Sequence, residues 1–325
     1  MNQHAFEARY EPSWAELEEA IRALSSRRRK SRRDARRIGR EFPGLYRRLC
    51  HHLALARARR YSLGLQQHLN RLALEGHRHL YRTRTVGLAA LVQFVLHDFP
   101  AAFRRHGRYV AVSVLLFGGS GLGMGLAVQI QPDLVYSLLE PHEVSAVEAM
   151  YDPENRVLGR ERESATDVAM FGFYIYNNVG IGFQTFASGL LFGIGSIFFL
   201  CFNGLFIGAL ASHLTSAGFT ETFWPFVVGH SSLELTAIVI FGAVGLMIGF
   251  AAAAPGRKKR WHAIRDRAAD AMPLVYGGSA MLVGAAFVEA FWSSTTWPPI
   301  GVKYLVGGIL WLALIVYFGL LGRGS

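Results

Sequence analysis

The segment Trp224-Pro-Phe-Val-Val-Gly-His-Ser-Ser-Leu-Glu-Leu-Thr-Ala-Ile-Val-Ile-Phe-Gly-Ala-Val-Gly-Leu-Met-Ile-Gly-Phe250 decides the fold class. An apolar run of about 20 residues is long enough to cross a bilayer as a helix. This run nevertheless contains Glu234, with His230 one helical turn before it. An acid inside a span costs about 3 kcal/mol on insertion scales and usually has a function. Glu289 repeats the anomaly in a later apolar segment. The chain is therefore predicted to be a membrane protein with a polar interior.

The other apolar segments predict further spans, so the chain is expected to form an all-α, polytopic membrane helix bundle. Six spans are expected, at about 109–130, 170–189, 192–213, 226–252, 273–294 and 302–321. The second and third share one 44-residue apolar stretch, and we place their junction near Gly189–Gly193. A re-entrant arrangement is the alternative there. The loop 131–169 carries nine acids and three arginines, so it is predicted to be an acidic external loop.

The N-terminal third differs sharply in composition from the rest. Residues 1–108 hold 23 Lys and Arg against 9 Asp and Glu. Residues 1–85 are predicted to form a basic cytoplasmic helical domain. A capping box, Ser13 to Glu16, is expected to open a helix that runs towards Ile38, and Pro43 to restart the chain. Leucines at helical spacing predict two further amphipathic helices and an antiparallel bundle. Residues 86–108 are predicted to form an interfacial amphipathic helix that Asp98–Pro100 ends.

A basic run lies in the first of these helices. Its simplest interpretation is a solvated helix face. The functional alternative is binding to anionic lipid head groups, which contribute about 1 kcal/mol per nearby charge. Nucleic acid is not expected as a partner, because no recognition motif or aromatic platform accompanies the charges. The residues concerned are Arg27, Arg28, Arg29, Lys30, Arg32, Arg33, Arg36 and Arg37.

Loop charge predicts the orientation in the membrane. Lys and Arg favour the cytoplasmic side. The N-terminal region and the segment Arg257-Lys-Lys-Arg260 are both basic, whereas the loops near Glu221 and Thr296 are almost free of positive charge. We therefore expect a multi-pass protein of the bacterial inner (cytoplasmic) membrane with both termini in the cytoplasm.

This topology places several polar residues at similar depth in the outer half of the bilayer. Glu234 and His230 share one helix face. Three interpretations compete: a polar interlock between helices, an ion or proton pathway, and a catalytic metal site. A zincin-type site needs a His-Glu-x-x-His helix or an equivalent third strong ligand, so no metal, cofactor or catalytic residue is predicted. The predicted polar cluster comprises Asn177, Asn178, Asn203, His230, Glu234 and Glu289.

The glycines of the spans indicate close helix packing. The stretch from Gly118 to Gly125 is glycine-rich, but it lies in a span and lacks the strand and the Lys-Ser or Lys-Thr of a nucleotide-binding loop. Small-xxx-small pairs let helices approach closely and favour a compact bundle or a homodimer. These pairs are Gly121/Gly125, Gly189/Gly193, Gly204/Gly208 and Gly245/Gly249.

Several of these features in order resemble the stage II sporulation protein M family of bacterial integral membrane proteins. The resemblance rests on Asn177-Asn178, Gly189-Leu-Leu-Phe-Gly193, Asn203-Gly204, Gly229-His230, Glu234-Leu235, Gly242, Gly245-Leu246 and Glu289-Ala-Phe291. The basic helices, from Trp14-Ala-Glu-Leu17 to Tyr81, also resemble the cytoplasmic region of many members. Ser231 stands where members often have glycine after the histidine, which puts the local backbone approach in doubt.

The resemblance implies a multispanning protein that, in sporulating bacteria, anchors cell-wall hydrolases in an engulfment complex. Together with the residues, it favours a non-enzymatic membrane scaffold or assembly component. Anionic lipids, unidentified partner proteins and a second copy of the chain are the expected partners. The alternative is a channel or transporter with an ion or proton pathway through Glu234, Glu289 and His230.

Overall fold

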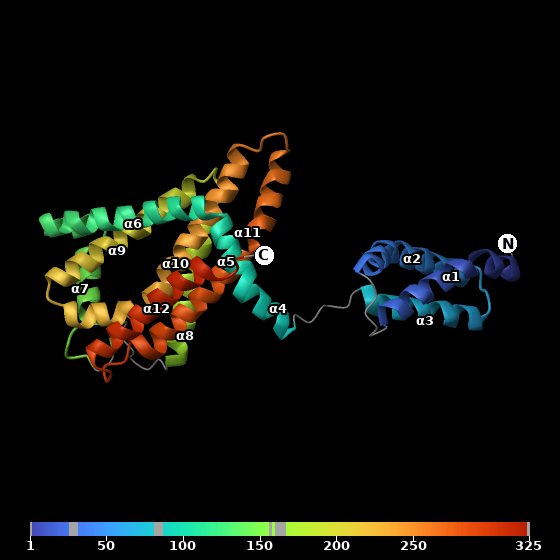
Figure 1. The fold of residues 1–325 in the computed structure, drawn as a ribbon, viewed down its shortest axis with the longest axis horizontal. Coiled ribbons are helices and arrows are strands. Elements are labelled where there is room, and N and C mark those ends of the chain that lie inside the picture. The colour runs from blue at the N-terminus through green and yellow to red at the C-terminus, as the bar shows by residue number, and fades with distance from the viewer. Residues whose placement is uncertain (1, 26–31, 81–86, 156–157, 160–166, 324–325) are drawn as a thin grey trace. The chain divides into compact units, whose positions relative to one another are not determined.

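The protein is described here from a computed structural model, which covers residues 2–25, 32–80, 87–155, 158–159 and 167–323 (Figure 1). Within these ranges every regular element is a helix, which confirms the all-α class. The chain divides into two compact units, Met1–Gly87 and Leu88–Ser325. Each unit has its own apolar core and is described by itself.

The first unit is a bundle of α1 (Gln3–Ser25), α2 (Arg32–Ala58) and α3 (Leu63–Leu80). Each of the three helices contacts the other two. Their apolar stripes meet in one core, as the leucine spacing predicted. The most deeply buried members of this core are Phe6, Leu17, Leu49, Leu69 and Leu72.

Two predicted helix boundaries in this unit are wrong. α1 begins ten residues before Ser13, because the Asn2 side chain accepts a hydrogen bond from the Ala5 backbone N–H at 2.9 Å and caps the helix there. Pro43 does not restart the chain but lies inside α2. Burial of Phe42, Leu45 and Leu49 on either side of it holds the helix together.

The basic run predicted to bind lipid falls largely beyond what the structure describes. Arg27, Arg28, Arg29 and Lys30 lie outside the described residues. Arg32, Arg33, Arg36 and Arg37 lie in the first turns of α2, of which the backbone alone is described. Their binding to anionic lipids therefore stays a prediction.

The second unit opens with α4 (Leu88–Gln93), a π-helical turn η1 (Phe94–Asp98) and α5 (Phe99–Arg105). The predicted end of the interfacial helix at Asp98–Pro100 is wrong. Pro100 lies in the first turn of α5, where the N–H that it lacks is not needed by the helix. The break comes instead at His106, before α6. Leu88, Leu91 and Val92 are exposed on α4, and their place at a membrane interface stays a prediction.

The predicted spans correspond to α6 (Gly107–Ile130), α8 (Asp167–Ala187), α9 (Ile194–Ser216), α10 (Thr220–Ala253), α11 (Arg260–Val288) with the π-helical turn η4 (Glu289–Ser293), and α12 (Ile300–Leu320). Among the described residues, five of these are long and apolar enough to cross a membrane; α8 is the exception. α8 has 21 residues, but it carries Asn177 and Asn178. The 3₁₀ turns η2 (Pro132–Ser137) and η3 (Ser188–Leu190) and the helix α7 (Pro141–Met150) complete the unit.

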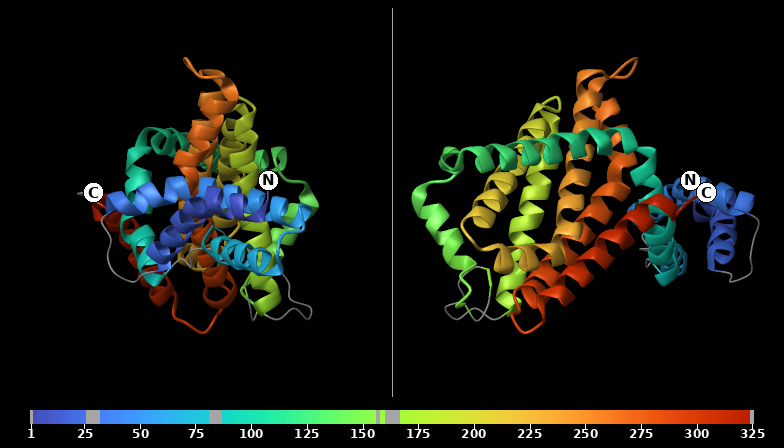
Figure 2. Two further views of the ribbon diagram at one scale, coloured as in Figure 1. Left: turned by 90° about the vertical axis from the view of Figure 1, so that its right-hand side faces the viewer. Right: turned by 60° about the vertical axis from the view of Figure 1, so that its left-hand side comes forward.

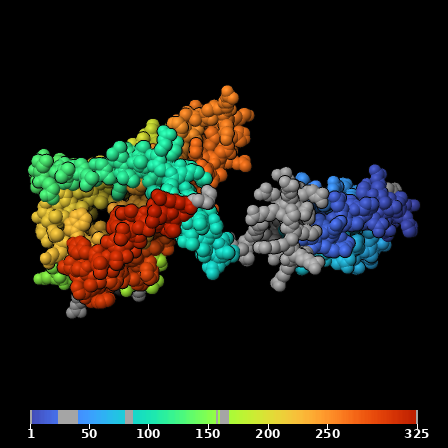
Figure 3. All heavy atoms as spheres, in the orientation of Figure 1, coloured from blue at the N-terminus to red at the C-terminus, as the bar shows by residue number. Residues whose placement is uncertain are grey.

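α10 is the central helix of this unit, surrounded by α6, α8, α9, α11 and α12 (Figures 1 and 2). Between Ala237 and Ala252 nearly all its residues are buried. They pack against Leu274, Met281 and Leu282 of α11 in the main apolar core. An apolar groove of about 400 Å³ follows the outside of the unit between α6 and α12, with Leu235 and Val239 of α10 among its lining residues (Figure 3).

Glycines bring the helix backbones of the second unit into direct contact. A methyl group on Gly208 of α9 would overlap the carbonyl oxygen of Gly121 of α6. Gly249 of α10 lies against the backbone of Gly193, whose φ of +86° allows the chain to turn between α8 and α9. Gly307 of α12 lies in the same way against Val228 of α10. The junction near Gly189–Gly193 is therefore a tight turn built on glycine.

Replacing Gly208 by alanine is expected to destabilise the second unit. The added methyl group has no space between α6 and α9, and overpacking of this kind costs about 1–3 kcal/mol. Gly123→Ala is the matched control on α6, because no atom lies within 4 Å of a Cβ there. Thermal unfolding of both variants in detergent measures the difference. Equal midpoints for Gly208→Ala and wild type would contradict the close contact.

The first unit is expected to become less stable as the pH is lowered, because His52 must then take up a proton. Trp14 Nε1–H donates to His52 Nδ1 at 3.1 Å, which requires an unprotonated Nδ1. Burial, and then the neighbouring charges of His51 and Arg48, lowers the pKa of His52 from its usual 6.5. The unfolded chain therefore binds a proton that the folded unit does not, so stability present above pH 6.5 is lost below it.

Hydrogen exchange of α1–α3 in the full chain tests this pH dependence. Peptides from these helices are expected to be less protected at pH 5.5 than at pH 7.5, after correction for intrinsic exchange rates. His52→Gln, which cannot be charged, should reduce the difference, whereas the exposed His4→Gln should not. An unchanged pH dependence in His52→Gln would assign it to other groups.

Candidate functional site

The polar residues of the spans meet at a cavity of about 240 Å³ in the second unit. Its walls come from α8, α9, α10 and η4, and the segment after α7 contributes Tyr151 and Gly159. Residues more than 100 positions apart in the sequence thus line the same cavity. The polar side chains among its lining residues are Tyr151, Tyr174, Asn177, Asn178, His230, Ser231, Glu234 and Glu289.

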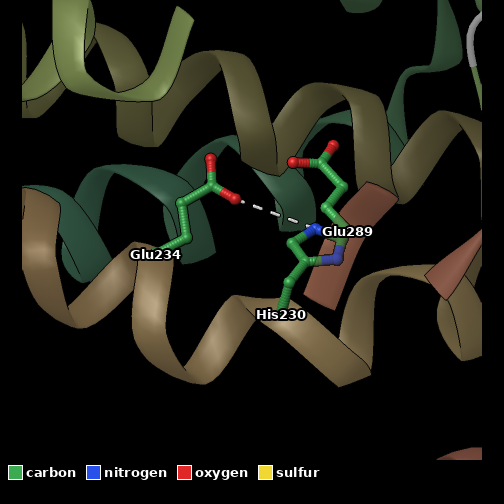
Figure 4. A group of neighbouring side chains, drawn as sticks. All are labelled: His230, Glu234 and Glu289. Atoms are coloured by element: carbon green, nitrogen blue, oxygen red, sulfur yellow. Dashed lines mark ion pairs between the residues drawn. The ribbon is translucent and has the colours of Figure 1, made fainter. Parts of the chain in front are cut away.

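Three ionisable groups converge at the centre of this site (Figure 4). His230 and Glu234 are one turn apart on α10, and Nε2 of the histidine lies 3.8 Å from Oε2 of the glutamate. Glu289 reaches the same point from η4. One nitrogen or oxygen of each residue lies within 4.8 Å of the others. We call these three residues the His-Glu-Glu cluster.

The π-helical turn η4 presents two residues to the same imidazole. Ser293 Oγ lies 3.0 Å from His230 Nδ1, while Glu289 is on the Nε2 side (Figure 4). The wider π-helical turn changes the direction of side chains relative to an α-helix, and such turns occur often at functional sites. Gly229 makes the approach possible, because a Cβ there would lie 3.0 Å from Ser293 Oγ.

α8 contributes amides to the cluster. Asn178 Nδ2 donates to Glu289 Oε2 at 3.4 Å, and Asn177 Nδ2 donates to Asn178 Oδ1 at 3.0 Å. Asn203, predicted to join them, lies apart. It does not line the cavity, and its Nδ2 donates to the carbonyl oxygen of Phe199, one turn earlier in α9. The side-chain amide of Asn203 thus finds its hydrogen-bond partner in the backbone of its own helix.

The segment after α7 forms part of the wall of the cavity. Tyr151 packs edge-on against the rings of Phe223 and Phe226. Its carbonyl oxygen accepts a hydrogen bond from Thr222 Oγ1 at 2.6 Å. Gly159 donates from its N–H to the Met150 carbonyl oxygen at 3.0 Å, and it has a φ of +93°. Part of the predicted acidic loop is therefore an ordered wall of the cavity; we call Tyr151 and Gly159 the lid.

The surroundings of the Tyr151 hydroxyl group disfavour its ionisation. Burial, and then the charge of Glu289, raises the pKa of the Tyr151 hydroxyl above its usual value of 10. The hydroxyl group therefore stays protonated and can act as a donor towards the carboxylates. None of the described residues that line the cavity is a lysine or an arginine. Lys303 lies in a neighbouring cavity, where its Nζ donates to the carbonyl oxygens of Ser293 and Thr295.

The polar cavity ends where the apolar core begins. A second, charged cavity lies at the other end of α10, beside Phe250 and Asp270. The stretch from Leu235 to Phe250 separates the two by about 22 Å at the rise of an α-helix. Twelve of the fourteen intervening residues are buried, and all the buried ones are apolar or glycine. The His-Glu-Glu cluster is therefore closed off on this side.

Comparison with protein families agrees with this geometry. The family model described as Stage II sporulation protein M matches residues 110–294, which is more than half of the chain. The chain belongs to this family. A second model, a domain of unknown function (DUF8413), matches residues 4–82, the helices of the first unit. No curated protein and no solved structure matched the chain.

The stage II sporulation protein M match covers α6 to η4 and so includes every residue that lines the polar cavity. α12 lies beyond it. Two contributions to the site were missed by sequence reasoning. Ser293 lies at the end of the fifth predicted span and has no distinguishing spacing, and Tyr151 reaches the cavity only through the fold of the loop.

Gly159→Ala in this family member is expected to loosen the lid. The substitution combines a strained positive φ with a Cβ only 3.1 Å from the Phe226 ring. Gly218→Ala is the matched control, since its φ is +98° and nothing lies within 4 Å of a Cβ. The backbone strain costs about 1 kcal/mol in both variants. Gly159→Ala should therefore unfold at a lower temperature than Gly218→Ala, and equal midpoints would mean that the lid does not pack on Phe226.

Proposed function

We propose that the protein is a non-enzymatic membrane scaffold or assembly component rather than a conduit. The observation that carries this proposal is the apolar section of α10 between Leu235 and Phe250. A pathway for ions or protons needs polar groups or water along its whole length. In the described structure this section lies between two polar cavities and is packed with apolar residues and glycine. Ser113 and Ser196 reach it, but each donates its hydroxyl group to a backbone carbonyl oxygen.

Membership of the stage II sporulation protein M family supports the same proposal. The resemblance implies that members hold cell-wall hydrolases in a complex. A separately folded first unit also suits a protein that meets partners outside the bilayer. Partner proteins, anionic lipids, a homodimer, and the bacterial inner membrane with both termini in the cytoplasm all remain part of the proposal. Light scattering of the detergent-solubilised protein would test the dimer.

An ion or proton pathway is the second candidate. The His-Glu-Glu cluster favours it, because two carboxylates and a histidine inside a span are typical of coupling sites in pumps and transporters. Movement of the lid and a rearrangement of α10 would both be required. The two candidates therefore differ in whether the purified protein conducts.

Flux measurements in liposomes separate the candidates. We expect the wild-type protein to give no more proton or monovalent-cation flux than empty vesicles, since the core around Phe241 and Val244 excludes water. Glu234→Gln and Glu289→Gln should behave identically, with unchanged elution and helix content. The readouts are an entrapped pH dye and cation-sensitive dyes under an imposed gradient.

Flux above the empty-vesicle level in wild type that disappears in folded Glu234→Gln would overturn the scaffold proposal. Glu221→Gln is the control, because Glu221 is exposed in the first turn of the same helix. Flux that persists in all the glutamate variants would indicate a leak through a different part of the protein.

A further inference from the structure

We infer that the His-Glu-Glu cluster is a binding site for one divalent transition-metal ion of the zinc type. This inference goes beyond the proposed scaffold function and does not depend on it. It rests on the convergence of His230, Glu234 and Glu289 at one cavity between helices that are far apart in sequence.

The first argument is geometric. Zinc is held by histidine nitrogen and carboxylate oxygen at about 2.0–2.2 Å, which puts two ligands of one ion about 3.3 Å apart. The three candidate atoms lie within 4.8 Å of one another, and Nε2 of His230 is 3.8 Å from Oε2 of Glu234. Rotation of the two glutamate side chains closes the remaining distance.

The second argument is chemical. Ser293 Oγ lies at hydrogen-bond distance from His230 Nδ1. When Nδ1–H donates to the serine, the lone pair of Nε2 faces the carboxylates. A metal-ligating histidine normally has such a partner on its other ring nitrogen, which fixes the tautomer. Asn178 supports Glu289 in the same way from α8.

The third argument is the charge balance. The side chains of His230 and Glu234 are 8% and 18% exposed, and no lysine or arginine is among the described residues that line the cavity. A carboxylate that is largely removed from water favours positive charge beside it. A divalent ion neutralises both carboxylates and uses the nitrogen, which calcium and magnesium do not favour. The ion would also link α10 to η4.

Metal content tests the inference directly. The full chain is purified with a streptavidin-binding tag, so that no polyhistidine contributes metal, from cells grown with added zinc. Inductively coupled plasma mass spectrometry should find about one zinc per chain. His230→Ala, Glu234→Gln and Glu289→Gln should each lose the bound metal. Glu221→Gln should retain it, which separates the site from the surface carboxylates and the histidines of the first unit.

Ser293→Ala provides a variant in which all three ligands are kept. Loss of the histidine's partner is expected to weaken zinc binding roughly 10- to 100-fold in a chelator competition. Cobalt added to metal-free protein should give visible absorption bands in wild type and none in Glu289→Gln. Hydrogen exchange and elution profiles of each variant establish that it is folded.

Two results would overturn the inference. One is a wild-type protein that contains no stoichiometric metal and binds neither zinc nor cobalt in titrations. The other is equal metal in wild type and in the combined His230→Ala and Glu234→Gln variant, which would assign the metal to an adventitious site. Flux measurements do not enter this test, so it can fail while the scaffold proposal stands.

Discussion

The second unit depends on one constraint: α10 is enclosed by other helices along nearly its whole length. A helix in that position must have small residues wherever a neighbouring helix packs most closely against it. Gly242, Gly245 and Gly249 supply these points towards α6, α9 and the α8–α9 turn. Without a hydrophobic driving force between helices in lipid, such close contacts provide much of the attraction between them.

Enclosure of α10 also creates the polar site. Once the helix is surrounded, His230 and Glu234 are largely removed from lipid and bulk water, so neighbouring elements must supply their polar partners. η4 does so with Ser293 and Glu289, and α8 with its paired asparagines. α8 accordingly carries two asparagines in its middle, and of the six described membrane helices it is the one without a continuous segment apolar enough to cross a membrane by composition alone. The polarity of α8 and the acid of α10 have the same cause.

The sequence predicts some of this arrangement well and some of it not at all. The helical class follows from apolar runs, and the α8–α9 turn follows from Gly189 and Gly193, because glycine is needed where backbones touch. The starts of α1 and α2 were mispredicted, since Ser13 and Pro43 carry strong local signals that packing of the first unit overrides. The sequence predicted only that the polar residues lie at a similar depth in the bilayer. It did not predict that one cavity brings together Asn178, His230, Glu234 and Glu289. Neither the π-helical turn nor the inward path of Tyr151 has a pattern in the sequence, because both arise from contacts between distant segments.

α12 has a consequence for how the protein is made. It lies beyond the family match, yet Gly307 packs against Val228 of α10, and Lys303 binds the carbonyl oxygens at the end of η4. Of the described helices it is also the last to leave the ribosome. Until it has been inserted, one side of α10 lacks its permanent neighbour. The bundle is therefore complete only once α12 has been inserted, and until then lipid or another protein lies against that side of α10.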